Sequence, residues 1–285
     1  KSNTSKNDIL EMMKKEKSMN ATAGIADPYF YEWTVGLEKI ISLMLPEENL
    51  KSVTLQSSTA GSLDDVVCEY SDSIEYIQVK HTRIDESLGF GFLISSSGNQ
   101  LSLLRKIAKS WNQLRDSDTN VKVVLLTNRH LVVNATSIIN VDSKIQVPSF
   151  REFWDWFEKA SHRCSTLSEL LDQTPEEWIE VVQIIINEAD VFDDDDDDEL
   201  VMDFFHSFSL KHQYPDTNKL DDSILVQLMK IFSISQESSV ELYQKLFFAL
   251  KEWASSTRQR EEITVEDVFS KLAAFEQQYP EFRLL

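Results

Sequence analysis

The 285-residue sequence has only two cysteines, Cys68 and Cys164, and they lie far apart with no CxxC pair and no paired histidines. This argues against a disulfide framework and against a zinc site, and it suits reducing conditions. No stretch approaches the roughly 18 consecutive apolar residues of a membrane span, and the lysine-rich start lacks the apolar segment of a signal peptide. We therefore expect a soluble, cytoplasmic protein with no membrane partner.

Charge is distributed unevenly along the chain. The formal net charge is −20, but residues 1–150 carry 16 Lys and Arg against 18 Asp and Glu, whereas residues 151–285 carry 12 against 30. The acidity belongs to the second half, so the first half can hold a local basic surface that binds phosphate. Basic residues gather within one stretch of the first half, among them Lys80, Arg83, Arg105, Lys106, Lys109, Arg115 and Arg129.

The first 150 residues have the pattern of an α/β core. Asp27-Pro28 is typical of a helix start, and apolar residues then recur at helical spacing up to Pro46. Three strand-like runs follow at 52–56, 64–70 and 74–82, then a basic amphipathic helix at 102–114 and an apolar strand at 121–129. This order, α-β-β-β-α-β, predicts a mixed sheet with helices on both sides.

Composition divides the chain into three predicted parts. Residues 1–23 are polar and lysine-rich, which favours a mobile arm or a short docking helix. Residues 24–148 form the α/β core. From residue 149 the pattern becomes wholly helical, so 149–285 is predicted as an acidic helical region that packs on the core or regulates it. Two sequences in it, Thr174–Glu177 and Thr264–Asp267, have the pattern of capping boxes at helix starts.

Polar residues interrupt the third predicted strand, "SIEYIQVKHT", at Gln78 and Lys80. Paired residue numbers in an antiparallel hairpin sum to a constant, so the turn decides which residue lies opposite Lys80. A three-residue loop places Asp64 there, and a two-residue loop that begins after Ser71 places Asp65 there. In either register an aspartate lies beside the amide and the ammonium group, and His81 points to the opposite face.

An aspartate, an amide oxygen and a lysine on one face can form a site for metal-assisted hydrolysis of a phosphodiester. Oxygen ligands hold Mg²⁺ or Mn²⁺, and Lys80 can orient the attacking water and stabilise charge on the phosphate. Because Gln78 supplies a neutral oxygen, we expect a further carboxylate, for which Glu32 is the candidate. The alternative is an ordinary amphipathic hairpin with a surface ion pair worth under about 1 kcal/mol.

Five segments in this order resemble the PD-(D/E)xK nuclease superfamily: "GIADPYFYEWTVGLEKII", "GSLDDVVCEY", "IEYIQVKHT", "SLLRKIAKSWNQL" and "VVLLTNR". The closest likeness is to the double-stranded-DNA endonuclease domain of bacterial anti-phage effectors, such as Cap-type CBASS effectors and Lamassu nuclease subunits. The resemblance implies a restriction-endonuclease-like core with Asp65 rather than Asp64 as metal ligand. Gln78 and Lys80 match the (D/E/Q)xK element, and Glu32 matches the polar residue of the first helix.

The resemblance implies a Mg²⁺-dependent endonuclease that cuts duplex DNA with little sequence preference in the bacterial cytoplasm. It also implies control by a sensor domain or partner subunit, typically through homo- or hetero-oligomerisation. From the residues alone, we expect DNA backbone contacts at Arg83 and on the basic helix, at Arg105, Lys106 and Lys109. The alternatives are a non-catalytic interaction subunit with a degenerate nuclease fold, and a nuclease that acts on RNA.

Overall fold

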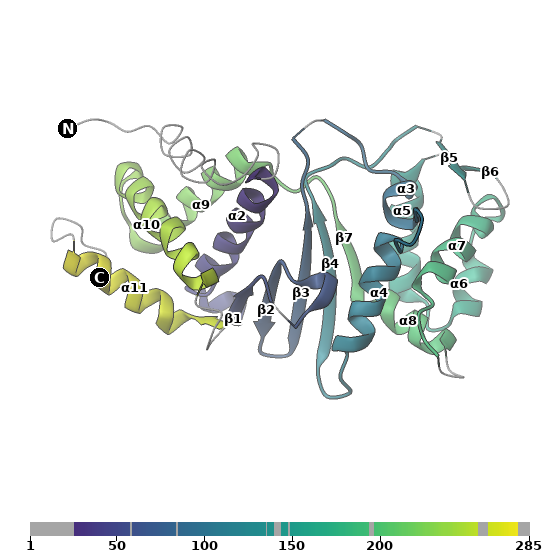
Figure 1. Ribbon diagram of the computed structural model, residues 1–285, viewed down its shortest axis with the longest axis horizontal. Helices are drawn as coiled ribbons and strands as arrows, with labels where there is room; N and C mark the ends of the chain where they lie inside the picture. The colour runs from purple at the N-terminus through teal and green to yellow at the C-terminus, as the bar shows by residue number, and fades with distance from the viewer. Residues whose placement is uncertain are drawn as a thin grey trace.

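A six-stranded mixed sheet lies at the centre of the molecule, and helices cover both of its faces (Figure 1). This architecture comes from a computed structural model that describes residues 26–57, 59–83, 85–134, 136–139, 144–147, 149–193, 197–255 and 262–278. The predicted arm at 1–23 lies outside the described residues. The prediction of an α/β fold with helices on both sides of a mixed sheet is confirmed.

The sheet has the strand order β7-β4-β3-β2-β1-β8. Its first three strands in the chain pair antiparallel, as predicted, whereas β4 lies parallel to both β3 and β7, and β8 pairs antiparallel with β1. β5 and β6 form a separate antiparallel pair. The strands are β1 (Leu50–Leu55), β2 (Val66–Tyr70), β3 (Ser73–Lys80), β4 (Asn120–Thr127), β5 (Thr136–Ile139), β6 (Lys144–Val147), β7 (Phe208–Lys211) and β8 (Glu262–Thr264).

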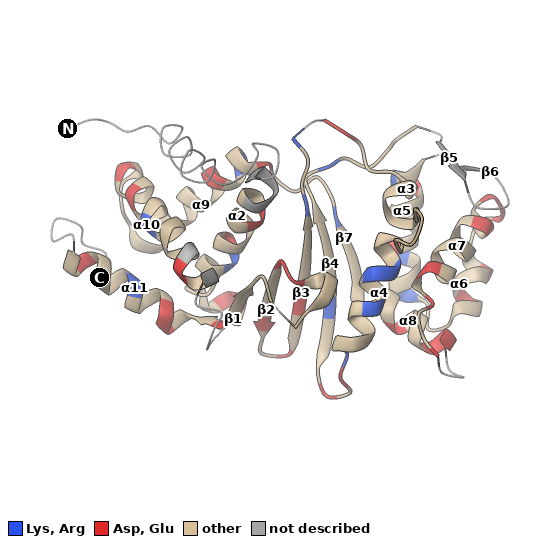
Figure 2. Ribbon diagram, in the orientation of Figure 1, with Lys and Arg blue, Asp and Glu red and all other residues tan. Residues whose placement is uncertain are grey.

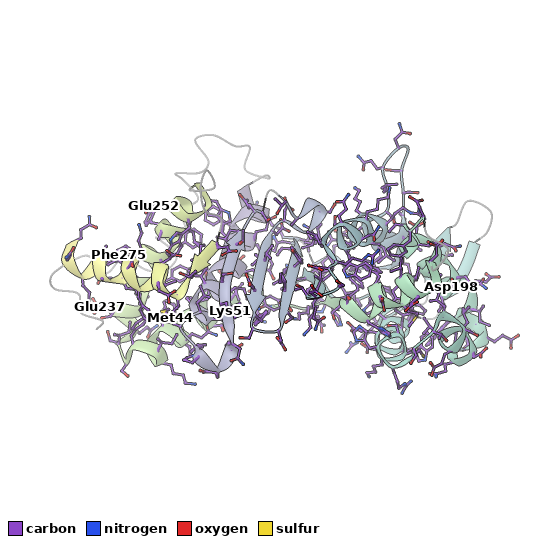
Figure 3. The ribbon with its side chains drawn as sticks, turned by 90° about the horizontal axis from the view of Figure 1, so that it is seen from below. Met44, Lys51, Asp198, Glu237, Glu252 and Phe275 are labelled. Atoms are coloured by element: carbon purple, nitrogen blue, oxygen red, sulfur yellow. The ribbon has the colours of Figure 1, made fainter. Side chains whose placement is uncertain are left out.

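Two groups of helices flank the sheet, and side chains fill both layers (Figure 3). One group consists of α2 (Ala26–Ser42), α9 (Thr217–Phe232), α10 (Gln236–Ser255) and α11 (Val265–Gln278). The other consists of α3 (Phe90–Ile94), α4 (Leu103–Leu114), α5 (Phe150–Arg163), α6 (Leu167–Gln173), α7 (Ile179–Ala189) and α8 (Asp197–Ser207). Three short 3-10 turns are η1 (Pro46–Glu48), η2 (Gly61–Leu63) and η3 (Glu176–Trp178).

Alternation along β3 assigns its side chains to the two layers. Ile77 and Val79 are buried against the α2 layer, whereas Tyr76 packs toward the layer of α4. Because successive side chains of a strand point to opposite faces, Gln78 and Lys80 belong to the α4 face. Each fully buried Ile or Val contributes roughly 1.5–3 kcal/mol, so this register is strongly specified.

The second half of the chain is not wholly helical, which corrects the prediction from periodicity. Phe208–Lys211 forms β7 next to β4, and Glu262–Thr264 forms β8 at the other edge of the sheet. Both strands are short, and β7 directly follows α8, so the helical spacing of Phe204, Phe205 and Phe208 conceals the change. Pairing with a neighbouring strand, which no local pattern reveals, determines the conformation there.

The two predicted capping boxes have different outcomes. Thr264 and Asp267 bond reciprocally at the start of α11, with the Thr264 amide 2.8 Å from the Asp267 carboxylate and the Asp267 amide 3.4 Å from the Thr264 hydroxyl. Thr174 instead ends α6, and its hydroxyl donates back to the Leu170 carbonyl at 2.7 Å. The prediction of a cap at Thr174 is therefore wrong, because that hydroxyl is used by the helix before it.

Candidate functional site

The candidate site lies where β3 ends and β2 begins. The observed register pairs Val66 with Ile77 and Glu69 with Ile74, which corresponds to a tight turn at Ser71-Asp72. Extended by one pair, it sets Asp65 opposite Gln78. Both registers predicted from the sequence are therefore wrong, because the turn is one residue shorter than the predicted three-residue loop and begins one residue before the predicted two-residue loop. It brings Asp65 to the amide rather than directly to Lys80.

Asp65 is held by two hydrogen bonds to a single carboxylate oxygen. Oδ2 accepts from Nε2 of Gln78 at 2.5 Å and from the backbone N–H of Val79 at 2.6 Å. A residue in a strand directs its N–H and C=O to the same side, so the Val79 carbonyl also points toward Asp65. Carboxylate, amide and backbone carbonyl thus converge at one end of the hairpin.

Burial sets the electrostatics of Asp65. Removal of the carboxyl group from water is the largest effect, and it raises the pKa from 3.8 to about 6. The Val79 hydrogen bond and the Lys80 charge lower the pKa by smaller amounts, and the Asp64 charge raises it. Gln78 is itself only 6% exposed. An ionised carboxylate in this position therefore lowers the stability of the fold.

Lys80 and His81 leave the strand on opposite faces, as the alternation predicts. Lys80 is half-buried and acts electrostatically on Asp65, and it makes no ion pair among the described residues. The His81 ring stacks on Tyr31 of α2 with centroids 4.4 Å apart. His81 therefore packs against the α2 layer, and Lys80 remains on the side of Asp65.

The other two predicted site residues, Asp64 as the alternative to Asp65 and Glu32 as the further carboxylate, make fewer contacts with the site. Asp64 ends η2, and its charge reaches Asp65, but its backbone carbonyl rather than its side chain makes the bond to Ser57, at 2.8 Å. Glu32 lies near the start of α2, at the same end of the sheet but on the layer opposite to Gln78. Glu32 as a third ligand stays a prediction.

Gly61 fixes the turn that leads into Asp65. Its φ is 61°, and the Ser110 hydroxyl of α4, which accepts from the Ser62 amide at 3.0 Å, would lie only 2.9 Å from an added Cβ. Both the backbone conformation and the close approach therefore require glycine.

Gly61→Ala is expected to destabilise the protein by about 2 kcal/mol or more, measured by urea unfolding. Gly98→Ala is the matched control, because Gly98 has a φ of 58° but no atom within 4 Å of an added Cβ. It should cost only the backbone strain, about 1 kcal/mol. Equal losses for the two variants would contradict a role for the Ser110 contact.

Asn128, which the sequence analysis did not single out, holds the end of β3. Its side-chain amide accepts from the Thr82 N–H at 3.0 Å and donates to the Thr82 carbonyl at 2.8 Å. This paired contact ties the residues after Lys80 to the end of β4. A polar residue directly after an apolar strand is a signal in the sequence, but its partner 46 residues away is not.

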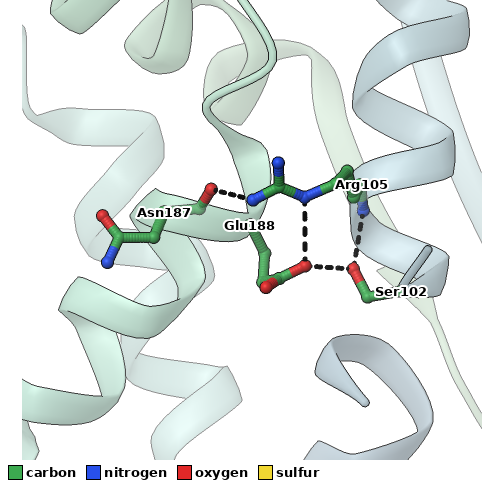
Figure 4. A network of polar contacts seen from close by, with 4 residues as sticks. All are labelled: Ser102, Arg105, Asn187 and Glu188. Carbon is green, nitrogen blue, oxygen red and sulfur yellow. Dashed lines mark hydrogen bonds and ion pairs between the residues drawn. The ribbon is translucent and has the colours of Figure 1, made fainter. Parts of the chain in front are cut away.

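The predicted DNA contacts have different environments. Arg105 belongs to a network between α4 and α7 (Figure 4): it bonds the Asn187 carbonyl at 2.7 Å and pairs with Glu188 at 3.4 Å, while Glu188 also accepts from the Ser102 hydroxyl. This network explains the place of Arg105 within the fold. Arg83 and Lys109 are exposed and Lys106 is half-buried, and all remain predicted contacts.

The residues of this site could supply oxygen atoms to a metal ion, but they carry few negative charges. Within the described ranges, no group of three or more His, Cys, Asp and Glu side chains could hold a metal ion. A half turn of the Gln78 amide exchanges its nitrogen and oxygen and brings the oxygen toward Asp65. One carboxylate, one amide oxygen and the Val79 carbonyl then suit Mg²⁺, which commonly binds through one or two carboxylates and completes its shell with water and phosphate.

Comparisons with known proteins give distant likeness among solved structures. No protein-family model and no curated protein matches the chain. Among solved structures it is similar to the Cap4 SAVED/CARF-domain containing receptor of Acinetobacter baumannii, solved with the cyclic trinucleotide 3'3'3'-cAAA, at 12% identity and a TM-score of 0.46. The similarity covers 90% of this chain and 47% of that one, so the chain spans about half of its length.

In the part of the chain that the structure describes, no helix is long and apolar enough to span a bilayer.

Proposed function

We propose that the chain is a metal-dependent nuclease that hydrolyses phosphodiester bonds at the site of Asp65, Gln78 and Lys80. The observation that carries the proposal is the contact of the partly buried Asp65 carboxylate with Gln78 and Val79, beside Lys80, which makes no ion pair among the described residues. A hydrophobic side chain at position 65 would avoid the cost of burying a carboxylate. The presence of a carboxylate at position 65 is explained if that carboxylate binds a cation during function.

Mg²⁺ bound at this position would lower the pKa of a coordinated water and offset negative charge on the phosphate. Asp65 would hold the cation, and the buried Gln78, with its amide turned by half a turn, would supply a neutral oxygen. Lys80, two residues further along the same face, would orient the attacking water and donate to a phosphate oxygen as charge develops. Glu32 and Asp64 are the additional carboxylates we propose as supporting ligands.

Double-stranded DNA, cut with little sequence preference, is the substrate we propose. The order α2-β1-β2-β3-α4-β4 and the resemblance of five sequence segments to PD-(D/E)xK nucleases support a restriction-endonuclease-like core. The same resemblance supports a role as effector in bacterial anti-phage defence. Such an activity endangers its host, so we propose that a sensor domain or partner subunit controls it, through assembly of an active oligomer.

Cleavage of supercoiled plasmid tests the proposal. The protein should convert plasmid to nicked and linear forms in Mg²⁺ or Mn²⁺ and leave it intact in EDTA, and parallel reactions with structured RNA decide the nucleic-acid class. Intact plasmid and intact RNA at all protein concentrations, including those that drive self-association, would favour a non-catalytic interaction subunit and overturn the proposal.

A further inference from the structure

A second group of polar residues lies next to the candidate site, at the carboxyl ends of β4 and β7. β3, β4 and β7 are parallel, so their carboxyl ends lie at the same edge of the sheet, where Figure 2 shows Lys and Arg at its upper end. Lys80 pairs with Thr127, and Arg129 and His130 follow β4 after Asn128. In open α/β sheets, ligands commonly bind outside this edge.

Backbone hydrogen bonds fix this edge as one unit. The Gln213 amide, after β7, donates to the Arg129 carbonyl at 2.9 Å, and the Arg151 amide, in the first turn of α5, donates to the Val132 carbonyl at 3.0 Å. The charges of Arg151 and His130 both act on His212. We call Arg129, His130, Arg151 and His212 the edge cluster.

Two members of the edge cluster can reach a ligand. His130 is exposed, and its Nδ1 lies 2.5 Å from the Gln213 side-chain nitrogen, while the other ring nitrogen, Nε2, can donate to a phosphate oxygen. Arg151 is exposed and makes no ion pair among the described residues, at the N-terminus of a 14-residue helix whose dipole favours anions.

The other two members support the cluster rather than bind. Arg129 pairs with Glu86 at 3.2 Å and lies over the Phe92 ring at 5.1 Å, which anchors the segment after β4. His212 is partly buried between the charges of Asp155, Arg151 and His130. The acidic residues Glu86, Glu152 and Asp155 also lie on this surface, and Glu86 is paired with Arg129. The exposed donors of His130 and Arg151 are therefore the groups that would bind an anion.

We infer that His130 and Arg151 bind a backbone phosphate of the nucleic acid on one side of the bond that is cut. This inference rests on the proposed nuclease function. His130 follows β4, the strand next to β3, and neighbouring strands lie about 4.8 Å apart. The contacted phosphate is therefore expected close to the one held at Lys80, on the side of β4.

The surface on the other side of β3 indicates in which direction a bound nucleic-acid strand continues from Lys80. A cavity of about 320 Å³ lies over β1, β2 and β3, and Glu69 and Glu262 line it together with serine and threonine hydroxyls. Two carboxylates repel a phosphate backbone. A strand held at Lys80 is thus expected to continue over β4 and β7 rather than over β2 and β1.

Fluorescence anisotropy of a labelled DNA duplex in EDTA tests the inference without cleavage. The double variant His130→Gln/Arg151→Gln should bind about tenfold more weakly. The slope of its log affinity against log salt concentration should become shallower by about the amount that one phosphate contact contributes. Lys159→Gln/Arg163→Gln is the matched control, because both side chains are exposed further along the same helix, α5. It should bind as the wild type does.

The outcomes separate this inference from the proposed function. If the His130/Arg151 variant binds as tightly as the wild type, or if only a Lys106→Gln/Lys109→Gln variant of α4 loses affinity, the edge cluster is not the phosphate site, whatever the plasmid assay gives. If the wild type binds no duplex, the inference also fails. If the wild type binds through the edge cluster but cleaves neither plasmid nor RNA in Mg²⁺, the nuclease proposal fails and the binding surface stands.

Discussion

Replacement of Lys80 by methionine is expected to lower DNA cleavage by about a thousandfold while leaving duplex binding in EDTA nearly unchanged. Methionine keeps the apolar stem of the half-buried side chain but removes the ammonium group. The Lys80 ammonium group acts electrostatically on Asp65. Loss of a charged donor at a reacting phosphate commonly lowers the rate by about 10²–10³. Because Lys80 makes no ion pair among the described residues, the substitution removes no salt bridge there.

Lys122→Met is the matched control for Lys80→Met. Lys122 is exposed on β4, near the opposite end of the sheet, where its strand pairs with Glu75 of β3. The same chemical change there should leave cleavage within about twofold of the wild type, since surface changes away from a site have small effects. Full cleavage by Lys80→Met would show that the reacting phosphate does not lie at this end of β3.

Asp65→Asn is expected to raise the free energy of unfolding while abolishing metal-dependent cleavage. The pKa of Asp65 is raised from 3.8 to about 6 in the fold, so the fold favours the protonated form. The folded protein thus carries a penalty that is absent below pH 3.8, grows as the pH rises to 6 and is then constant. A pKa change of this size corresponds to about 3 kcal/mol at pH 8 and about half of that near pH 5.

Asparagine can keep the contacts of Asp65 without this penalty. Its Oδ1 can accept from the Val79 N–H, and a turned Gln78 amide can accept from its Nδ2. Urea unfolding at pH 5 and pH 8 should therefore show a larger gain at pH 8, whereas Asp203→Asn, at an exposed position of α8, should show little change at either pH. A loss of stability, or a gain that does not depend on pH, would contradict a buried and ionised Asp65.

Local patterns were sufficient for the elements that form the first half of the core. The meander of β1, β2 and β3 and the helix α4, with Ser102 as its cap, lie within two residues of their predicted positions. Helix α2 begins at Ala26, next to the predicted Asp27-Pro28 start. Alternation and capping act between near neighbours in sequence, so the sequence alone reveals them.

Features that depend on distant partners could not be predicted in this way. The two-residue turn at Ser71-Asp72 shifts the register by one pair, and only the packing of Ile77 and Val79 on α2 fixes that choice. The short strands β7 and β8 depend on β4 and β1. Arg105 likewise has the sequence context of a DNA contact, but its partner Glu188 is 83 residues away.

The central claim is that Asp65 and Gln78 hold a divalent cation, and a Mn²⁺ titration without nucleic acid tests it most directly. Electron paramagnetic resonance at pH 7.5 measures the free ion in the presence of the wild type and of Asp65→Asn. We predict that the wild type binds Mn²⁺ at one site and that Asp65→Asn weakens this binding at least tenfold, since coordinating carboxylates supply most of the attraction for a hard cation. Equal affinity of both proteins for Mn²⁺, or no binding by the wild type, would contradict the claim.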